Sequence, residues 1–182
     1  MMLDSLTVRT RVVTTLVFLL FVIWFGNLGY RSLVRPDEGR YAEIAREMAI
    51  TGDWTTPRLN GIKYFEKPPL QYWMTAAAFK AFGEHEWTAR LWAALTGFAG
   101  VLMVGFTGAR LFGRQAGFYS AVVLASSLLY AVIGHINTLD MGVTFWLTIG
   151  LLGFLLGQRG ARRTRETRLW MLLAWWQWDS VS

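Results

Sequence analysis

Residues 91–109 read LWAALTGFAGVLMVGFTGA, a continuous stretch without a charged side chain that ends at Arg110. A helix of about 20 predominantly apolar residues crosses the hydrocarbon core of a membrane, so this stretch predicts a transmembrane helix. Comparable apolar blocks occur at 12–30, 117–133 and 141–157, and another begins at Leu169 but is interrupted in Trp175-Trp176-Gln177-Trp178-Asp179. The chain is therefore predicted to be an all-α integral membrane protein whose last span, 169–182, is incomplete.

The composition agrees with a membrane protein and argues against other classes. Hydrophobic residues make up 54% of the 182 residues, and the mean hydropathy is +0.34. The net charge of +6 could indicate a nucleic-acid partner, but the basic residues flank the apolar blocks, as in the positive-inside pattern. We therefore expect membrane lipids as partners and no nucleic acid. The chain has no cysteine, which excludes disulfides and thiol catalysis.

The first block, 12–30, has an alternative interpretation as a cleavable signal peptide, because Arg9 and Arg11 precede it. It is longer than a typical signal-peptide core, and no small-x-small cleavage site follows it. An uncleaved first span is the favoured prediction.

A shorter apolar segment, Pro69–Phe82, is not predicted to cross the membrane. At ~1.5 Å rise per residue it reaches only about 20 Å, and it carries Gln71 and Lys80. Its apolar side chains recur at helical spacing; they are Leu70, Trp73, Met74, Ala77 and Ala81. We expect an amphipathic helix over about 69–82 that lies in the membrane interface.

The arginines near the apolar blocks set the expected topology. They are Arg9, Arg11, Arg110, Arg114 and the cluster within 159–168. If 69–82 does not span the membrane, all of them lie on one side, which the positive-inside rule identifies as cytoplasmic. If 69–82 spans, the rule is broken. The loop 31–90 and the turn 135–140 are therefore expected to face outward, into the periplasm of a bacterium.

The outward loop opens with Arg35-Pro36-Asp37-Glu38-Gly39-Arg40. Pro36 cannot lie inside a helix, so a juxtamembrane helix is expected over about 38–51, with Gly52 as a natural stop. Its apolar stripe consists of Tyr41, Ile44, Ala45 and Met48. The turn-rich stretch that follows ends in Glu66-Lys67-Pro68-Pro69, a stiff corner that is expected near the membrane surface.

Each charged candidate in the loop also has a purely structural interpretation. Asp37 could be a helix N-cap, and Arg40 could belong to a solvated helix face. Glu66 and Lys67 could form an ordinary solvated pair. Asp140 could cap the fourth span, but an ionisable residue at the membrane edge costs free energy unless something satisfies it. Its expected position on the same side as Asp37 favours a functional role.

Several motifs, in this order along the chain, resemble one family of membrane enzymes. They are Arg35-Pro36-Asp37-Glu38-Gly39-Arg40-Tyr41, Gly52-Asp53-Trp54, Tyr64-Phe65-Glu66-Lys67-Pro68-Pro69-Leu70, Glu86-Trp87-Thr88-Ala89-Arg90-Leu91, Leu111-Phe112-Gly113 and Thr138-Leu139-Asp140-Met141. Together they resemble lipid-phosphosugar-dependent glycosyltransferases of the GT-C fold, in the protein O-mannosyltransferase-like group (glycosyltransferase family 39). Within that group they resemble the bacterial aminoarabinose transferases that modify lipid A. The resemblance covers about 12–158.

The resemblance implies a reaction and a place for it. A sugar, preferably 4-amino-4-deoxy-L-arabinose, would move from a polyprenyl phosphate carrier to lipid A or a similar acceptor, on the periplasmic side of the bacterial inner membrane. The acceptor loses a proton as it attacks, and a carboxylate can take that proton. Asp37 is the expected base, and Asp140 is the expected second carboxylate that orients the acceptor or tunes Asp37.

The other candidate residues concern the departing phosphate. A nearby cation stabilises the charge that develops on it, and Lys67 is expected to do so. Arg58 and Tyr64 are further candidates for the phosphate, and Arg40 and Glu38 are expected to support the site. The resemblance also implies that Glu66 helps to hold a divalent metal ion.

Members of this family are considerably longer, so the chain is expected to be an N-terminal fragment, or a truncated or frameshifted product, that is inactive by itself. Two other functions compete. One is a non-catalytic scaffold derived from such an enzyme. The other is a transporter component in which Asp140 couples an ion, but transporters usually carry internal repeats, and none is visible here.

Overall fold

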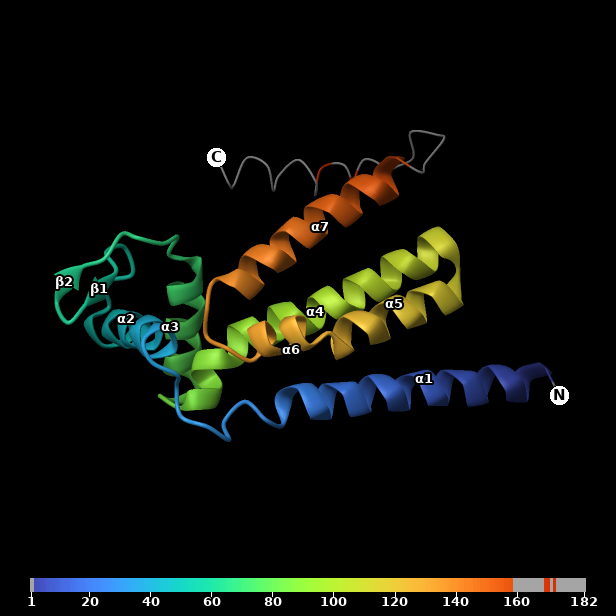
Figure 1. Ribbon diagram of the computed structural model, residues 1–182, viewed down its shortest axis with the longest axis horizontal. Coiled ribbons are helices and arrows are strands. Elements are labelled where there is room, and N and C mark those ends of the chain that lie inside the picture. The colour runs from blue at the N-terminus through green and yellow to red at the C-terminus, as the bar shows by residue number, and fades with distance from the viewer. Residues whose placement is uncertain (1, 159–168, 171, 173–182) are drawn as a thin grey trace.

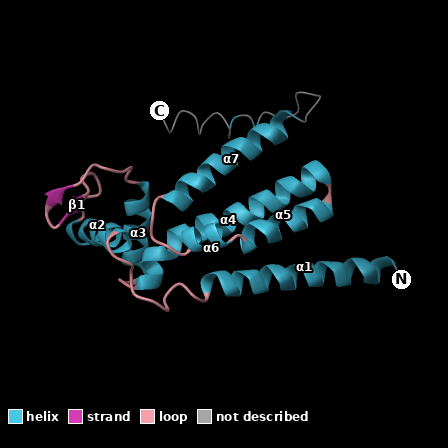
Figure 2. Cartoon of the chain, in the orientation of Figure 1, coloured by secondary structure: helices cyan, strands magenta, loops and turns pink. Residues whose placement is uncertain are grey.

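The computed structural model of the protein describes residues 2–158, 169–170 and 172 (Figure 1). The order of its elements is α1 (Met2–Phe25), α2 (Asp37–Thr51), β1 (Arg58–Leu59), β2 (Ile62–Lys63), α3 (Leu70–Phe82), α4 (Glu86–Phe112), α5 (Arg114–Ser126), α6 (Leu128–Gly134) and α7 (Asp140–Gln158). The two short strands form an antiparallel hairpin, and every other described element is a helix (Figure 2). The predicted all-α class is confirmed, while most of the predicted fifth span and all of 159–168 lie outside the described residues.

The helices have the lengths and composition of a multi-pass membrane protein. α4 and α7 are each long and apolar enough to cross a membrane. α5 and α6 pass the same test together, as one span that is bent by 67°. At ~1.5 Å per residue, α4 reaches about 40 Å, which exceeds the ~30 Å hydrocarbon core.

The helices begin and end at other residues than the predicted spans, and two of the differences have a clear local cause. α1 ends at Phe25 and not at Tyr30, because the glycines that follow favour helix poorly and the carbonyl of Leu28 accepts a hydrogen bond from Arg90. The predicted span 117–133 is interrupted at Ser127, which has an extended backbone (ψ 117°). Paired serines compete with the helix for backbone hydrogen bonds, and the Ser126 hydroxyl donates to the Val123 carbonyl at 3.2 Å.

α2, α3 and the hairpin lie together at one end of the long helices, and we call residues 37–82 the outer module (Figure 1). The end of α1, the start of α4 and the turn between α6 and α7 lie at that same end (Figure 1). The turn between α4 and α5, with Arg110 and Arg114, lies at the opposite end. The loop and the turn that were expected to face outward are therefore at one end of the molecule.

α4 is the central helix and contacts α1, α3, α5, α6 and α7. Its contact with α5 is a close backbone approach through small residues. A Cβ on Gly117 would collide with the Gly105 carbonyl and with Ala109. Small residues at this position let two membrane helices pack closely.

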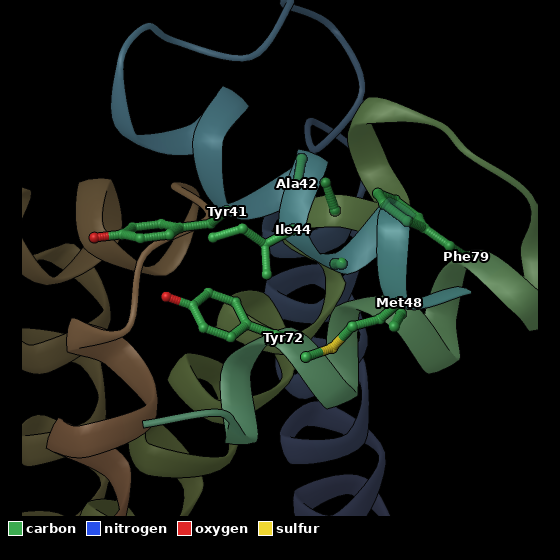
Figure 3. Packing of buried hydrophobic residues seen from close by; sticks show 9 residues of the cluster. Tyr41, Ala42, Ile44, Met48, Tyr72 and Phe79 are labelled. Carbon is green, nitrogen blue, oxygen red and sulfur yellow. The ribbon is translucent and has the colours of Figure 1, made fainter. Parts of the chain in front are cut away.

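The outer module has its own apolar core between α2, α3 and α4 (Figure 3). The stripe predicted on α2 is buried in it, which confirms that part of the pattern; its members are Tyr41, Ile44, Ala45 and Met48. α3 buries Tyr72, Ala76 and Phe79 there. The stripe predicted on α3 lies on its opposite face, where Leu70 and Trp73 are exposed; the contact of this face with the membrane interface stays a prediction.

Candidate active site

Glu38 and Arg90 form a buried ion pair where the outer module meets the long helices. Both side chains are 1% exposed. Arg90 Nε and Nη2 donate to the two Glu38 carboxylate oxygens at 2.8 and 3.0 Å. The other Arg90 hydrogen bonds run to the carbonyls of Leu28, Arg31 and Ser32 at 2.7, 2.9 and 3.0 Å. The pair therefore joins α2 and α4 to the chain that follows α1.

Glu38 also holds the turn between α6 and α7. Its Oε1 accepts from the Asn137 backbone N–H, and its Oε2 accepts from the Val34 N–H, both at 2.8 Å. Burial opposes ionisation of Glu38, but the hydrogen bonds from Arg90, Val34 and Asn137 outweigh it and lower the pKa. Gln71 Nε2 of α3 donates to Asn137 Oδ1 at 2.8 Å. The start of α2 and the turn before α7 are thus held together, although Glu38 and Asn137 are 99 positions apart.

Asp37, Arg40, Tyr64 and Glu66 form a partly exposed cluster on the outer module, which we call the Asp37–Glu66 cluster. Asp37 Oδ1 lies 3.5 Å from Arg40 Nη2. Arg40 Nη1 donates to the Tyr64 hydroxyl at 3.3 Å, and that hydroxyl donates to Glu66 Oε2 at 2.5 Å. The hydrogen bond with Tyr64 raises the pKa of Arg40, which stays a cation. The structure therefore brings together four residues that the sequence singled out.

Asp37 is not a helix cap. Pro36 occupies the N-cap position of α2, and no side chain caps this helix end. Asp37 is the first helical residue, and its side chain is 57% exposed. A carboxylate there is favoured by the helix dipole and is accessible to a group that approaches from outside.

The two predicted cationic phosphate ligands differ in their surroundings. Lys67 is exposed and makes no hydrogen bond or ion pair within the described part of the chain. Arg58 belongs to the hairpin: its Nε lies 3.8 Å from Asp53 Oδ2, and its Nη1 donates to the Gly61 carbonyl at 3.4 Å. Lys67 is thus unpaired among the described residues, whereas Arg58 already stabilises a turn.

Asp140 is the first residue of α7 and is exposed. It makes no hydrogen bond or ion pair with another residue that the structure describes. The contact between Glu38 and Asn137 holds the turn before Asp140 against the start of α2, where Asp37 lies. The two carboxylates are therefore on the same end of the molecule and on adjoining segments.

Glu66 does not by itself make a metal site. Among the described residues, no group of three or more His, Cys, Asp or Glu side chains could hold an ion. Glu66 Oε2 accepts from Tyr64, and a single carboxylate does not fix a metal. The residues described do not fit a metal ion on their own, and the metal ion stays a prediction.

Reasoning from the sequence missed the roles of Arg90 and Asn137. A signal was present for Arg90, because it opens an apolar span and a charge at the membrane edge needs a partner. The partner itself, Glu38, lies 52 positions away and could not be identified from local sequence.

Comparison with known proteins bears on this arrangement. Residues 9–175 match the family model described as dolichyl-phosphate-mannose-protein mannosyltransferase. The chain is 40% identical over 152 residues to the undecaprenyl phosphate-alpha-4-amino-4-deoxy-L-arabinose arabinosyl transferase of Aeromonas salmonicida, and 35% identical over 147 residues to the protein of that name from Erwinia tasmaniensis. These matches cover 82% and 80% of the chain. The chain spans only 27% of the length of each relative.

The fold is also similar to that of a solved structure, ArnT from Cupriavidus metallidurans bound to undecaprenyl phosphate. The TM-score is 0.88 at 40% sequence identity, and the match covers 92% of this chain and 31% of the other. The apo structure of the same ArnT matches with a TM-score of 0.89, over 93% of this chain and 32% of the other.

Proposed function

Since this chain belongs to the dolichyl-phosphate-mannose-protein mannosyltransferase family, we propose that it forms the outer-loop part of the active site of a membrane glycosyltransferase. The proposed donor is a polyprenyl phosphosugar that carries 4-amino-4-deoxy-L-arabinose, and the proposed acceptor is lipid A or a similar envelope lipid. The observation that carries the proposal is the close fold match, at 40% identity, to an ArnT that was crystallised with undecaprenyl phosphate. The names of the Aeromonas and Erwinia relatives supply the sugar.

The proposed proton acceptor is Asp37. The acceptor hydroxyl gives its proton to this carboxylate while its oxygen attacks the anomeric carbon, and the electron pair of the breaking C–O bond goes to the phosphate of the carrier. Asp37 is exposed, and Arg40 lies at 3.5 Å, where it holds the carboxylate in place. Asp140 orients the acceptor from the adjoining segment.

The proposed phosphate ligand is Lys67. As an exposed ammonium without a protein partner in the described residues, it can neutralise the charge that the leaving phosphate gains. Tyr64 of the neighbouring Asp37–Glu66 cluster supports Lys67 in binding the phosphate. Arg58 can bind the phosphate only if its ion pair with Asp53 breaks.

We infer that the reaction takes place at the outer surface of the bacterial inner membrane. The outer module and both carboxylates lie at one end of the helices, and Arg110 and Arg114 lie at the other (Figure 1). Arginines favour the cytoplasmic side, which leaves the periplasm for the site. The apolar face of α3 suits a lipid-linked donor, because it keeps the site at the membrane surface.

The test is sugar transfer in membranes. The complete gene product that contains these residues is incubated with candidate polyprenyl phosphosugars, and lipid A is followed by mass spectrometry. The expected result is lipid A that gains one aminoarabinose mass per transfer, only with the aminoarabinose donor. Transfer of a different sugar would overturn the choice of donor. No transfer to lipid A from any donor, with a folded protein, would overturn the function.

A further inference from the structure

The apolar core of the outer module contains a buried hydroxyl that has no partner among the described residues. Tyr72 of α3 is 0% exposed, and its hydroxyl is buried with no hydrogen-bond partner among the described residues. Tyr41 of α2 packs beside it, with ring centroids 5.9 Å apart. Figure 3 shows both hydroxyls on the same side of the packed core. Native proteins pair nearly all such groups because leaving one unpaired costs stability, so a binding role would explain this one.

The groups that act electrostatically on the Tyr72 hydroxyl are Tyr41 and three members of the cluster, Tyr64, Glu66 and Arg40. Burial is the main cause that raises the pKa of Tyr72, so its hydroxyl stays protonated and can both donate and accept a hydrogen bond. Tyr64 of the cluster packs against the apolar core that contains Tyr41 and Tyr72, so this core adjoins the cluster.

The polar contact beside this hydroxyl is weak enough to open. The hydrogen bond from Arg40 to Tyr64 is 3.3 Å long, beyond the usual N–H···O range of 2.7–3.2 Å. Arg40 is 31% exposed, and Tyr64 is half-buried. A polar ligand group that separated Arg40 from Tyr64 would open a way from the partly exposed cluster toward the core against which Tyr64 packs.

We propose that the Tyr72 hydroxyl, with Tyr41 and the Asp37–Glu66 cluster, forms the subsite for the sugar unit of the donor, and that Tyr72 hydrogen-bonds a hydroxyl or amino group of that sugar. The carboxylates of Asp37 and Glu66 can accept hydrogen bonds from hydroxyl or ammonium groups of a sugar. Lys67 directly follows Glu66, so a phosphate on Lys67 places the attached sugar beside the cluster. The inference rests on the proposed function and adds a specificity-determining residue to it.

The test compares Tyr72→Phe with the wild type in the complete gene product. The thermal shift caused by undecaprenyl phosphoaminoarabinose should shrink in the variant, whereas the shift caused by undecaprenyl phosphate alone should not change. The kcat/KM for the donor should fall about two- to tenfold, the value of one hydrogen bond. Without ligand, the variant should be as stable as the wild type or more stable, because the change removes an unpaired buried hydroxyl.

Tyr130→Phe is the matched control. The Tyr130 hydroxyl donates to the Gly97 carbonyl at 2.9 Å, so this variant should lose stability and keep the difference between the two ligand shifts.

Four results separate the possibilities. If Tyr72→Phe binds the phosphosugar like the wild type, the hydroxyl holds only a buried water and the inference is wrong. If both ligand shifts fall together, Tyr72 serves the phosphate, which also overturns it. A wild type that the phosphosugar stabilises no more than the phosphate has no sugar subsite. A wild type that transfers no sugar, but whose phosphosugar shift depends on Tyr72, leaves the subsite standing and rejects the proposed function.

Discussion

Asp37 and Glu38 are neighbours in the sequence with opposite environments. Successive residues of an α-helix point about 100° apart, so one carboxylate faces the exposed cluster and the other faces Arg90. The sequence predicted the helix and the importance of this pair of acids. It could not predict which acid was buried, because the answer depends on Arg90, far along the chain.

Glu38→Gln should destabilise the protein strongly, because Arg90 would remain buried without its charge partner. Breaking such a pair costs about 3–5 kcal/mol of the free energy of unfolding. The double variant Glu38→Gln with Arg90→Met should recover part of the loss, since it removes both charges. Thermal unfolding in detergent measures both effects. Equal stability of Glu38→Gln and the wild type would contradict the structural role of the pair.

The contribution of Glu38 to the stability of the folded protein should also depend on pH. The hydrogen bonds lower its pKa in the folded protein below the ordinary value of 4.5, so it stabilises the folded state fully above that pH. The stabilisation is lost as pH falls from 4.5 through the lowered pKa. A pH series of melting temperatures should therefore show a steeper acid loss in the wild type than in Glu38→Gln.

Lys67→Ala should weaken use of the donor far more than Lys80→Ala. Lys67 has no protein partner in the described residues, whereas Lys80 on α3 places its Nζ 5.5 Å from the centre of the Trp54 ring. Lys67→Arg should rescue only in part, because a forked guanidinium does not replace a compact ammonium. Steady-state kinetics with varied donor measure the effect. Wild-type donor kinetics in Lys67→Ala would remove the phosphate role.

At the scale of elements, the contact between α4 and α5 depends on one glycine. Gly117→Ala should lower the free energy of unfolding by about 1–3 kcal/mol, because the new Cβ meets backbone that cannot move aside. Gly39→Ala in α2 is the control. Its Cβ meets nothing within 4 Å, so alanine should gain about 0.5–1 kcal/mol from helix propensity. The free energy of unfolding of both variants, measured in the same detergent, checks this contrast. If Gly117→Ala left that free energy unchanged, α4 and α5 would be able to move apart at little cost.

The elements were predicted to different degrees. α2 and its buried stripe followed from a clear helical period, and its end at Gly52 is confirmed by a left-handed backbone at that residue, with φ 73°. The hairpin of β1 and β2 was not predicted, because its strands have two residues each and the sequence showed only turn signals. The break at Ser127 was missed as well, because hydropathy does not register a change of backbone direction inside an apolar run.

For the whole molecule, the arginine pattern and the fold agree on which segments share an end. Single cysteines can test the orientation, since these 182 residues contain none. Ile62 on the hairpin is 74% exposed. A cysteine in its place should therefore react with an impermeant maleimide from the periplasmic side. Arg114→Cys should react only after the inner membrane is permeabilised. Equal labelling of both in intact spheroplasts would contradict the topology.

The proposed active site combines α2 with the turn that leads into α7, so it belongs to the scale of the whole molecule. Asp37 and Asp140 are exposed and lie on segments that the Glu38–Asn137 contact holds together. The sequence could place both carboxylates on one side of the membrane and assign them to one site by resemblance. It could not supply the buried pair that joins the two segments, because that pair forms between residues far apart in the chain.

Asp37→Asn should therefore leave the fold intact and remove catalysis. The residue is exposed and caps nothing, so its loss should not change the melting temperature. Turnover should fall by about 10²–10⁴, the usual contribution of a general base. Asp140→Asn should also slow turnover, and the double variant should lose less than the product of the two single effects, because residues that act as a unit are not additive. Single-turnover transfer to lipid A measures all three variants. If the two losses multiply, the carboxylates act independently; if Asp37→Asn is folded and nearly fully active, the base is another residue, and the exposed position of Asp37 has a different purpose.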